Sequence, residues 1–284
     1  MAGQPAMIPP LQVDGIDVFV EGEGGESIVM IHGWPDTWRL WGAQAAFFRS
    51  RYRCVRFTLP GFDIEKPRRA YSLAEMLSIL EHILDRTCSG RKVILMLHDW
   101  GCAFGYQFAM RHPSRVSKIV GVDIGDAGTR AHVRSLSAKA KAMIFAYQMW
   151  LAIAWRLGGR IGDGMTRWMA RTIRCPSDPR FIGSCMDYPY YIAWFKAHGS
   201  YRDMVRFDPP VPMLFVYGKR KPFLFHTPAW ADALAARPGC AVRAFATGHW
   251  VMSDQPREFN EAVEAWLAGS AEPSQQKKEP AHGL

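Results

Sequence analysis

The sequence predicts an α/β fold with a mostly parallel central sheet and an inserted helical cap. Short apolar, strand-like runs alternate with helical patterns through the first part of the chain, as is typical of parallel strands joined by crossover helices. From about residue 127 to residue 207 this rhythm stops, and the chain becomes helical, aromatic and methionine-rich. It resumes at VPMLFVYG (211–218). One core interrupted by an insertion accounts for this layout.

The domain boundaries follow from the interruption. The strands after it are too few to build a second sheet, so both flanking parts are assigned to one core. We predict a core in two pieces, 1–126 and 208–267, with a helical cap over 127–207. The remaining residues, 268–284, are polar and include two prolines, which predicts a disordered tail.

Local patterns place the individual elements. Short runs rich in apolar and β-branched residues predict strands over 11–22, 27–33, 52–59, 91–97, 116–123, 211–218 and 240–250. Helical periodicity with start and stop signals predicts helices over 38–49, 72–88, 101–112, 228–236 and 256–269. The glycine-rich EGEGGES (21–27) lacks the context and trailing lysine of a phosphate loop, so a hairpin turn is predicted there.

Composition predicts an ordinary globular protein. Of 284 residues, 49% are hydrophobic and 21% charged. The chain has no apolar run of 18 residues, and MAGQPAMIPP lacks the regions of a signal peptide. We therefore expect a cytoplasmic protein without a membrane span. The six cysteines show neither a C-x-x-C pair nor zinc spacing, which argues against a metal site or a disulfide framework.

The net charge of +9 has a local concentration. Five arginines spaced largely by three or four residues form one expected helical face: Arg156, Arg160, Arg167, Arg171 and Arg174. A nucleic-acid or acidic-membrane patch is one interpretation of this face, and a solvated helix surface is the favoured one, so no nucleic-acid partner is expected. The apolar segment 143–155 is expected to face a cavity within the cap rather than a membrane.

The stretch LMLHDWGCAFGY (95–106) places an acid, Asp99, where an apolar strand turns into a helix. Such a corner exposes its central side chain above the carboxyl edge of a sheet, and Gly101 lets the helix pack closely. A carboxylate that attacks an ester carbonyl would form a reactive anhydride, whereas on a saturated carbon with a strained or good leaving group it forms an ordinary ester. Asp99 therefore suits alkyl transfer, although an acid at a corner can also serve as a helix N-cap.

Two further motifs accompany this corner: IHGWP (31–35), just after a strand, and GHW (248–250), just after the last strand. With HDWG (98–101) between them, the motifs resemble the α/β-hydrolase family, specifically its epoxide hydrolase and haloalkane dehalogenase branch. The resemblance spans about Leu11 to Leu267 and covers the core more closely than the cap. It implies the α/β-hydrolase fold and a hydrolase that uses no cofactor and no metal.

The catalytic roles follow from the chemistry and this resemblance. Asp99 is the expected nucleophile, and His249 is the expected base that activates water to hydrolyse the ester. The negative charge of the second step develops on the ester carbonyl oxygen of Asp99, so it requires backbone donors nearby. By resemblance these donors are the N–H groups of Trp34 and Trp100. Pro35 stands where the family carries a cis bond.

The third member of the triad departs from the family pattern. Many members carry an acid after the next-to-last strand, in a G-x-x-D pattern, but VYGKRKP puts Lys221 at that position. A cation there cannot stabilise an imidazolium. Some dehalogenases that resemble this sequence place the acid at the end of the next strand, the one that follows the helix after Asp99. Asp123 closes that strand and is the first choice, with Asp126 next; either could instead cap a helix or stabilise the loop.

The leaving group separates two activities. Opening an epoxide leaves an alkoxide, to which epoxide hydrolases supply a proton from two cap tyrosines. Tyr147 in FAYQMW resembles the surroundings of the first tyrosine, and Tyr190 and Tyr191 in DYPYYIAWF both remain candidates for the second. An aromatic and methionine-rich stripe can also be plain cap core.

Expelling a halide requires weakly basic N–H donors, which the indoles of Trp34 and Trp100 could supply. The dehalogenases typically carry Asn where this chain has Trp34, which counts against dehalogenation, although Trp150 or Trp194 could substitute.

The sequence thus predicts an enzyme, an epoxide hydrolase that converts an apolar epoxide to a diol with water as co-substrate. The aromatic cap offers contact area but few polar anchors, which favours an apolar small molecule. Haloalkane dehalogenase is the first alternative. A non-catalytic binding protein on the same scaffold is the second, because the usual acid position is lost.

Overall fold

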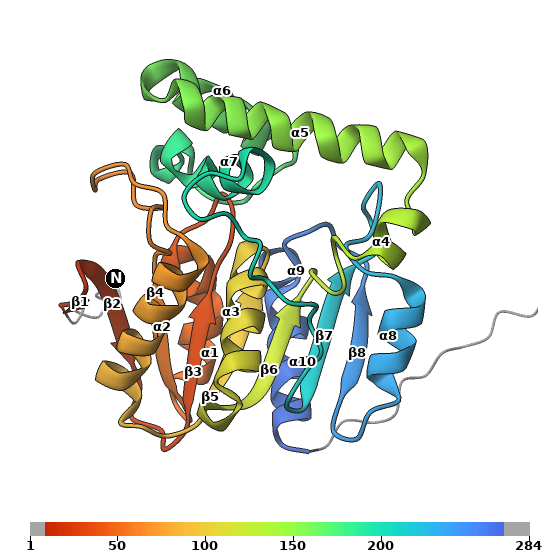
Figure 1. The fold of residues 1–284 in the computed structure, drawn as a ribbon. Coiled ribbons are helices and arrows are strands. Elements are labelled where there is room, and N and C mark those ends of the chain that lie inside the picture. Colours follow the sequence, from red (N-terminus) through yellow and green to blue (C-terminus); the bar gives the residue numbers. More distant parts are fainter. Residues whose placement is uncertain (1–8, 270–284) are drawn as a thin grey trace, which may run out of the picture.

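The computed structural model describes residues 9–269, which form one eight-stranded sheet covered by helices (Figure 1). The strands are β1 (Leu11–Val13), β2 (Ile16–Glu21), β3 (Ser27–Ile31), β4 (Arg53–Phe57), β5 (Val93–His98), β6 (Val116–Val122), β7 (Met213–Gly218) and β8 (Ala241–Phe245). Their order is β1-β2-β4-β3-β5-β6-β7-β8. The pairs β1–β2 and β2–β4 are antiparallel and all other pairs are parallel. The mostly parallel α/β architecture is therefore confirmed.

The helices between the strands also follow the sequence pattern. The α-helices are α1 (Gly42–Phe48), α2 (Leu73–Cys88), α3 (Trp100–Arg111), α4 (Arg130–Ser135), α5 (Ala138–Leu157), α6 (Gly159–Thr172), α7 (Tyr188–Phe195), α8 (Pro228–Ala235), α9 (Val251–Asp254) and α10 (Pro256–Leu267). Helix α2 begins with a capping box, in which Ser72 and Glu75 satisfy each other's backbone N–H groups, a stabilisation of about 1 kcal/mol. This box fixes the start of the helix at the residue that the sequence predicts.

The two faces of the sheet bury alternate residues of the same strands. In β3 and β5, Val29 and Leu95 belong to the cluster beneath α2 and α3, whereas Ile28 and Ile94 belong to the cluster beneath α1 and α10. All four side chains are at most 1% exposed, and burial of each such side chain contributes about 1.5–3 kcal/mol. Because both faces are covered, the strands are continuous apolar runs.

The prediction of a hairpin turn at EGEGGES is wrong. Residues 21–27 connect β2 to β3, but β4 lies between these two strands, so they do not pair. The glycines are needed for close approach instead: a Cβ on Gly24 would lie 2.0 Å from the carbonyl oxygen of Arg51. The hairpin occurs earlier, at Asp14 and Gly15 between β1 and β2, where both residues have positive φ.

Residues 127–207, called the cap segment below, contain α4 to α7 and lie between β6 and β7 in the chain. Figure 1 shows the parallel strands pointing toward these helices, with α7 nearer the sheet and α5 and α6 outermost. The domain boundaries themselves stay a prediction, and 270–284 of the expected disordered tail lie outside the described residues. No helix within 9–269 is long and apolar enough to cross a membrane.

Candidate active site

The candidate nucleophile, Asp99, sits between β5 and α3 with φ 52° and ψ −122°. A residue other than glycine in this region stores strain of about 1–3 kcal/mol, as is common at functional sites. Its side chain makes no N-cap hydrogen bond to the helix, so helix capping does not account for the acid. Gly101 allows the tight corner, because a Cβ there would lie 2.3 Å from the carbonyl oxygen of Ile31.

The sheet brings Asp99, His249 and Asp123 together from the carboxyl ends of β5, β8 and β6. Nε2 of His249 lies 3.5 Å from Oδ2 of Asp99. Nδ1 of the same ring bonds to Oδ2 of Asp123. Asp123 is fully buried, and the Asp99 and His249 side chains are each 15% exposed. Nucleophile, base and orienting acid thus stand in the order that a catalytic triad requires.

The sequence analysis missed the role of Lys221. Its Nζ pairs with both carboxylate oxygens of Asp123, and the lysine side chain is only 7% exposed. The backbone N–H of Gly218 also donates to Oδ1 of Asp123, at 3.2 Å. The lysine in the G-x-x-D position was the feature of the sequence that could have indicated this contact. The structure shows that it pairs with Asp123, which follows β6.

These contacts set the charge states of the site. Burial would lower the pKa of His249, but Asp123 and Asp99 outweigh it and raise this pKa to about 9. Burial would raise the pKa of Asp123, but Lys221 and His249 hold it well below its usual range. His98, whose ring centroid lies 4.4 Å from that of His249, has a pKa lowered to about 3, chiefly by burial. Near neutral pH the site therefore holds two carboxylates, an imidazolium and a neutral His98.

The loop after β3 approaches the Asp99 carboxylate closely. The backbone N–H of Trp34 donates to Oδ1 of Asp99 at 2.8 Å. A Cβ on Gly33 would lie 2.5 Å from both this Oδ1 and the backbone nitrogen of Trp100, so the two backbone N–H groups border the same small space. His32 fixes the turn, accepting from the N–H of Leu59 at 2.8 Å. The Trp34–Pro35 peptide bond is cis.

The alternative acid, Asp126, lies in a different environment. Its carboxylate accepts hydrogen bonds from the N–H and hydroxyl of Thr227, at 2.7 and 3.0 Å. Thr227 is the N-cap of α8, so Asp126 fixes the start of that helix. The structure brings Asp123, and not Asp126, to His249.

The three candidate tyrosines separate in space. Tyr190 is buried and packs edge-on against Trp34 and Trp100, with ring centroids 5.9 and 5.4 Å away, and against Tyr147 at 6.1 Å. After burial, the charge of Asp99 contributes to raising the pKa of Tyr190 and also that of Tyr147. Both rings therefore border the nucleophile.

Tyr191 has other neighbours. Its ring lies against Trp155 and Phe195, with centroid distances of 4.5 and 5.0 Å. Consecutive residues of a helix point in directions about 100° apart, so only one of the two tyrosines faces Asp99.

Three of the four indole N–H groups that could hold a halide already have acceptors. Trp34 donates to the buried carboxyl of Asp187 at 2.6 Å. The two cap indoles are also engaged: Trp150 donates to the carbonyl of Met165 at 3.0 Å, and Trp194 to the side chain of Gln148 at 2.9 Å. The sequence analysis did not foresee Asp187, an acid set within the apolar and aromatic CMDYPYY.

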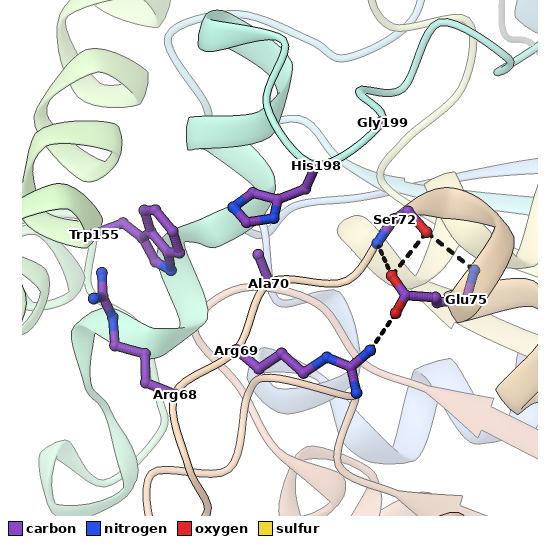
Figure 2. Close-up of a pocket in the computed structure, with 8 residues that line it drawn as sticks. All are labelled: Arg68, Arg69, Ala70, Ser72, Glu75, Trp155, His198 and Gly199. Carbon is purple, nitrogen blue, oxygen red and sulfur yellow. Dashed lines mark hydrogen bonds and ion pairs between the residues drawn. The ribbon is translucent and has the colours of Figure 1, made fainter.

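A cavity of about 710 Å³ opens where the cap segment meets the core, away from the triad residues (Figure 2). Arg68 lies over the indole of Trp155 there, 4.3 Å from the ring centroid. Arg69 pairs with Glu75, whose carboxylate also belongs to the α2 capping box. The contact between Arg68 and Trp155 joins the core to the cap segment. Among residues 9–269 no cluster of acidic, His or Cys side chains is arranged to bind a metal.

Comparison with known proteins identifies the family of this chain. Residues 28–262 match the alpha/beta hydrolase family. The chain is 25% identical over 264 residues to Epoxide hydrolase 1 of Caenorhabditis elegans, covering 84% of this chain and 64% of that protein. It is 29% identical over 108 residues to Epoxide hydrolase B of Mycobacterium tuberculosis, covering 37% of this chain and 30% of that protein. The chain thus spans less than two thirds of the length of either relative.

Solved structures show the same fold. An epoxide hydrolase from Bacillus megaterium in complex with an inhibitor superposes with a TM-score of 0.70 at 20% identity, covering 91% of this chain and 99% of that chain. A loop variant of the haloalkane dehalogenase DbeA from Bradyrhizobium elkanii gives 0.66 at 18% identity, covering 91% and 95%. The α/β-hydrolase fold implied by the three motifs is confirmed.

Proposed function

This chain belongs to the alpha/beta hydrolase family, and from that premise we propose that it is an epoxide hydrolase that forms a covalent ester on Asp99. The observation that carries the proposal is the difference between the two oxygens of this carboxylate. Oδ1 accepts from the backbone of Trp34 at 2.8 Å, and Oδ2 lies 3.5 Å from Nε2 of His249. Oδ1 therefore occupies the oxyanion position, and Oδ2 is the oxygen left to attack.

In the first step, Oδ2 of Asp99 bonds to one epoxide carbon. The ring C–O bond breaks, its electron pair moves to the ring oxygen, and that oxygen takes a proton from Tyr190 or Tyr147. The phenol oxygen of Tyr147 accepts a hydrogen bond from Gln148 at 3.1 Å, so its O–H remains available to donate. Burial raises the pKa of both tyrosines, which keeps them protonated until the alkoxide forms.

The ester leaves Asp99 without its charge. That charge is one of the influences that raise the pKa of His249, so alkylation lowers this pKa. The proton that the imidazolium gives up replaces the one lost from the tyrosine, which leaves the neutral imidazole that the second step requires. His249 takes a proton from water as the water oxygen bonds to Cγ of Asp99. The negative charge moves to Oδ1, beside the N–H groups of Trp34 and Trp100.

Collapse of this intermediate breaks the bond between Cγ and Oδ2. The proton that remains on the water-derived hydroxyl passes to Oδ2, and the diol leaves with that oxygen. The water oxygen completes the Asp99 carboxylate, and His249 keeps the other proton of the water as the imidazolium of the resting site. Asp123 keeps the imidazole oriented and stabilises its charged form. Dehalogenation is less well supported because three of the four candidate indole donors, those of Trp34, Trp150 and Trp194, already serve other acceptors. The aromatic surroundings of Asp99 favour an apolar epoxide.

The direct test is the intact mass of a His249→Gln variant after separate exposure to an aryl epoxide and a bromoalkane. Without the base, an ester on Asp99 should persist. A mass increase equal to the whole epoxide supports the proposal. The double variant Asp99→Asn, His249→Gln is the control and should gain no mass.

Two other outcomes lead elsewhere. An alkyl adduct without bromine assigns the protein to dehalogenation. A folded variant that forms no adduct with either compound rejects both activities for these substrates and favours a binding role for the scaffold.

A further inference from the structure

We propose that the outer face of the cap segment docks on the surface of a bilayer that contains anionic phospholipid. The face consists of the exposed sides of α5 and α6, which Figure 1 shows as the layer farthest from the sheet. Its composition of apolar, aromatic and cationic side chains carries the proposal, which does not depend on the chemistry at Asp99.

All of the chain's net charge lies in the cap segment. Residues 127–207 contain 13 of the 35 Lys and Arg residues but only four of the 26 Asp and Glu residues, so their net charge is +9 and the rest of the chain is neutral. Three of these four acids are engaged: Asp187 is buried, Asp178 pairs with Arg180, and Asp163 accepts hydrogen bonds from the turn before α7. The cap segment therefore attracts anionic surfaces.

Helix α5 presents apolar residues to solvent. Phe145, Ile153 and Leu157 are 51%, 44% and 58% exposed, and their spacing, with that of the exposed Ala142, puts them on one side of the helix. A surface helix ordinarily turns polar residues outward. The expectation that 143–155 faces a cavity thus explains only the inner side of α5, which carries Tyr147.

Helix α6 extends this face and adds charge to it. Ile161 and Trp168 are 69% and 52% exposed. Arg160 and Arg171, also exposed, lie on the same side of this helix by their spacing. The five arginines expected to form one helical face are divided between α5, α6 and the residues after α6. Two of them, Arg160 and Arg171, stand beside exposed apolar side chains.

This combination fits a lipid surface better than the other occupants. Tryptophan, phenylalanine and aliphatic side chains enter the boundary between head groups and acyl chains, and arginines beside them pair with anionic head groups. A second copy of the chain would bring two surfaces of charge +9 together. A nucleic acid would pair with the arginines but leave Leu157 and Ile161 without apolar contacts.

Docking would place α5 between the bilayer and the proposed site. Its outer side carries Ile153, and its inner side carries Tyr147, whose ring packs against Tyr190. Apolar substrates partition into bilayers, so this position would bring the site next to its substrate reservoir. Only this consequence rests on the proposed function.

Co-sedimentation of the full chain with vesicles tests the docking. We expect binding to vesicles of phosphatidylcholine with about 30% phosphatidylglycerol to exceed binding to phosphatidylcholine alone by about tenfold or more. The pairs Ile161→Ser with Trp168→Ser and Arg160→Ala with Arg171→Ala should each weaken binding about tenfold. Only the arginine pair should also reduce the dependence of binding on salt.

The matched control is Lys219→Ala with Arg257→Ala, which removes two exposed cations from the core. It should bind like the unmodified chain, and an equal loss in this control would overturn a specific face. The absence of vesicle binding would overturn the proposal. A dimer in ultracentrifugation that the Ile161 and Trp168 changes disrupt would overturn it in favour of a second copy of the chain. Binding of duplex DNA that depends on the two arginines would overturn it in favour of a nucleic acid. Because vesicle binding needs no turnover, failure of this test and failure of the proposed activity are separate results.

Discussion

Lys221 pairs with both oxygens of Asp123, the same carboxylate that bonds to Nδ1 of His249. A single buried acid therefore contacts both the candidate base and a lysine whose pKa is lowered by burial. Lys221 neutralises much of the negative charge that Asp123 would otherwise present to the imidazole. It acts as a positioning residue that keeps the pKa of His249 from rising further.

Replacing Lys221 by Met should raise the pKa of His249. The other charged and titratable groups facing the ring are Asp99, Asp123 and His98 with Asp36 behind it. Without the lysine, Asp123 stabilises the imidazolium more strongly, so hydrolysis of the trapped ester, which needs neutral imidazole, should shift to higher pH by about one unit. Single-turnover rates across pH and histidine NMR titrations would measure this shift.

Lys219→Met is the matched control, because Lys219 is exposed and lies two residues before Lys221 in the chain. The dependence of ester hydrolysis on pH should not change in this variant. Lys221→Arg should restore the original profile. Loss of one partner of a buried pair can cost about 3–5 kcal/mol, so thermal unfolding must accompany each profile. Identical NMR titrations in all variants would contradict the role of Lys221.

Tyr190→Phe and Tyr191→Phe form a second matched pair. Removing the Tyr190 hydroxyl should slow ester formation from an epoxide about 10²–10⁴-fold, the range of general acid catalysis. Tyr191 packs on Trp155 and Phe195 instead, so its hydroxyl should contribute less than about twofold. Stopped-flow measurement of alkylation decides, and equal rates for the two variants would refute the assignment of Tyr190.

Asp123→Asn and Asp126→Asn distinguish the two acids. Asp123→Asn should reduce turnover about 10³–10⁴-fold, by analogy with the loss of the orienting acid in other triads. Asp126→Asn should retain turnover but lose about 1–2 kcal/mol of stability, because it weakens the anchor of Thr227 at α8. Steady-state kinetics and chemical unfolding of both variants provide the comparison. A turnover loss confined to Asp126→Asn would reverse the assignment.

Asp187 should make stability depend on pH. Burial raises its pKa well above the usual range, so the folded state holds the proton more tightly than the unfolded state. The protonated carboxyl therefore contributes its full free energy of stabilisation below the pKa of Asp187 in the unfolded chain, about 4. This contribution is lost as pH rises through the pKa of Asp187 in the folded protein. Asp187→Asn can keep the contacts with Trp34 and Thr166 and avoids this loss.

The melting temperature of Asp187→Asn relative to the unmodified chain should therefore rise between pH 5 and pH 8, by about 2–4 °C for each 1 kcal/mol gained. Asp187→Ala is the contrasting variant. It leaves the buried indole N–H of Trp34 without an acceptor, whereas the hydroxyl of Thr166 keeps the carbonyl of Gly162 at 2.9 Å. We expect this variant to be destabilised at both pH values by about 1–3 kcal/mol. A difference between Asp187→Asn and the unmodified chain that does not change with pH would show that Asp187 ionises normally.

Much of the architecture can be predicted from the sequence because it depends on local patterns of residues. The buried strands are short apolar runs, α2 begins at a capping box, and the elbow places Asp99 where a strand meets a helix. The antiparallel hairpin was misplaced because glycines serve two purposes. At Gly24 they permit close approach to a distant loop, and at Gly15 they permit a positive φ in a turn.

The alternation of strands and helices in the sequence predicts parallel strands, and parallel strands joined by helices end at the same edge of the sheet, which is where Asp99 and His249 lie. The order of the strands is known from the structure. Only the tertiary structure decided which groups around them are free to react. Hydrogen bonds between residues far apart in the chain occupy the indole of Trp34 with Asp187 and join Lys221 to Asp123. A buried polar group must find a partner wherever the fold supplies one, and no local pattern records that choice.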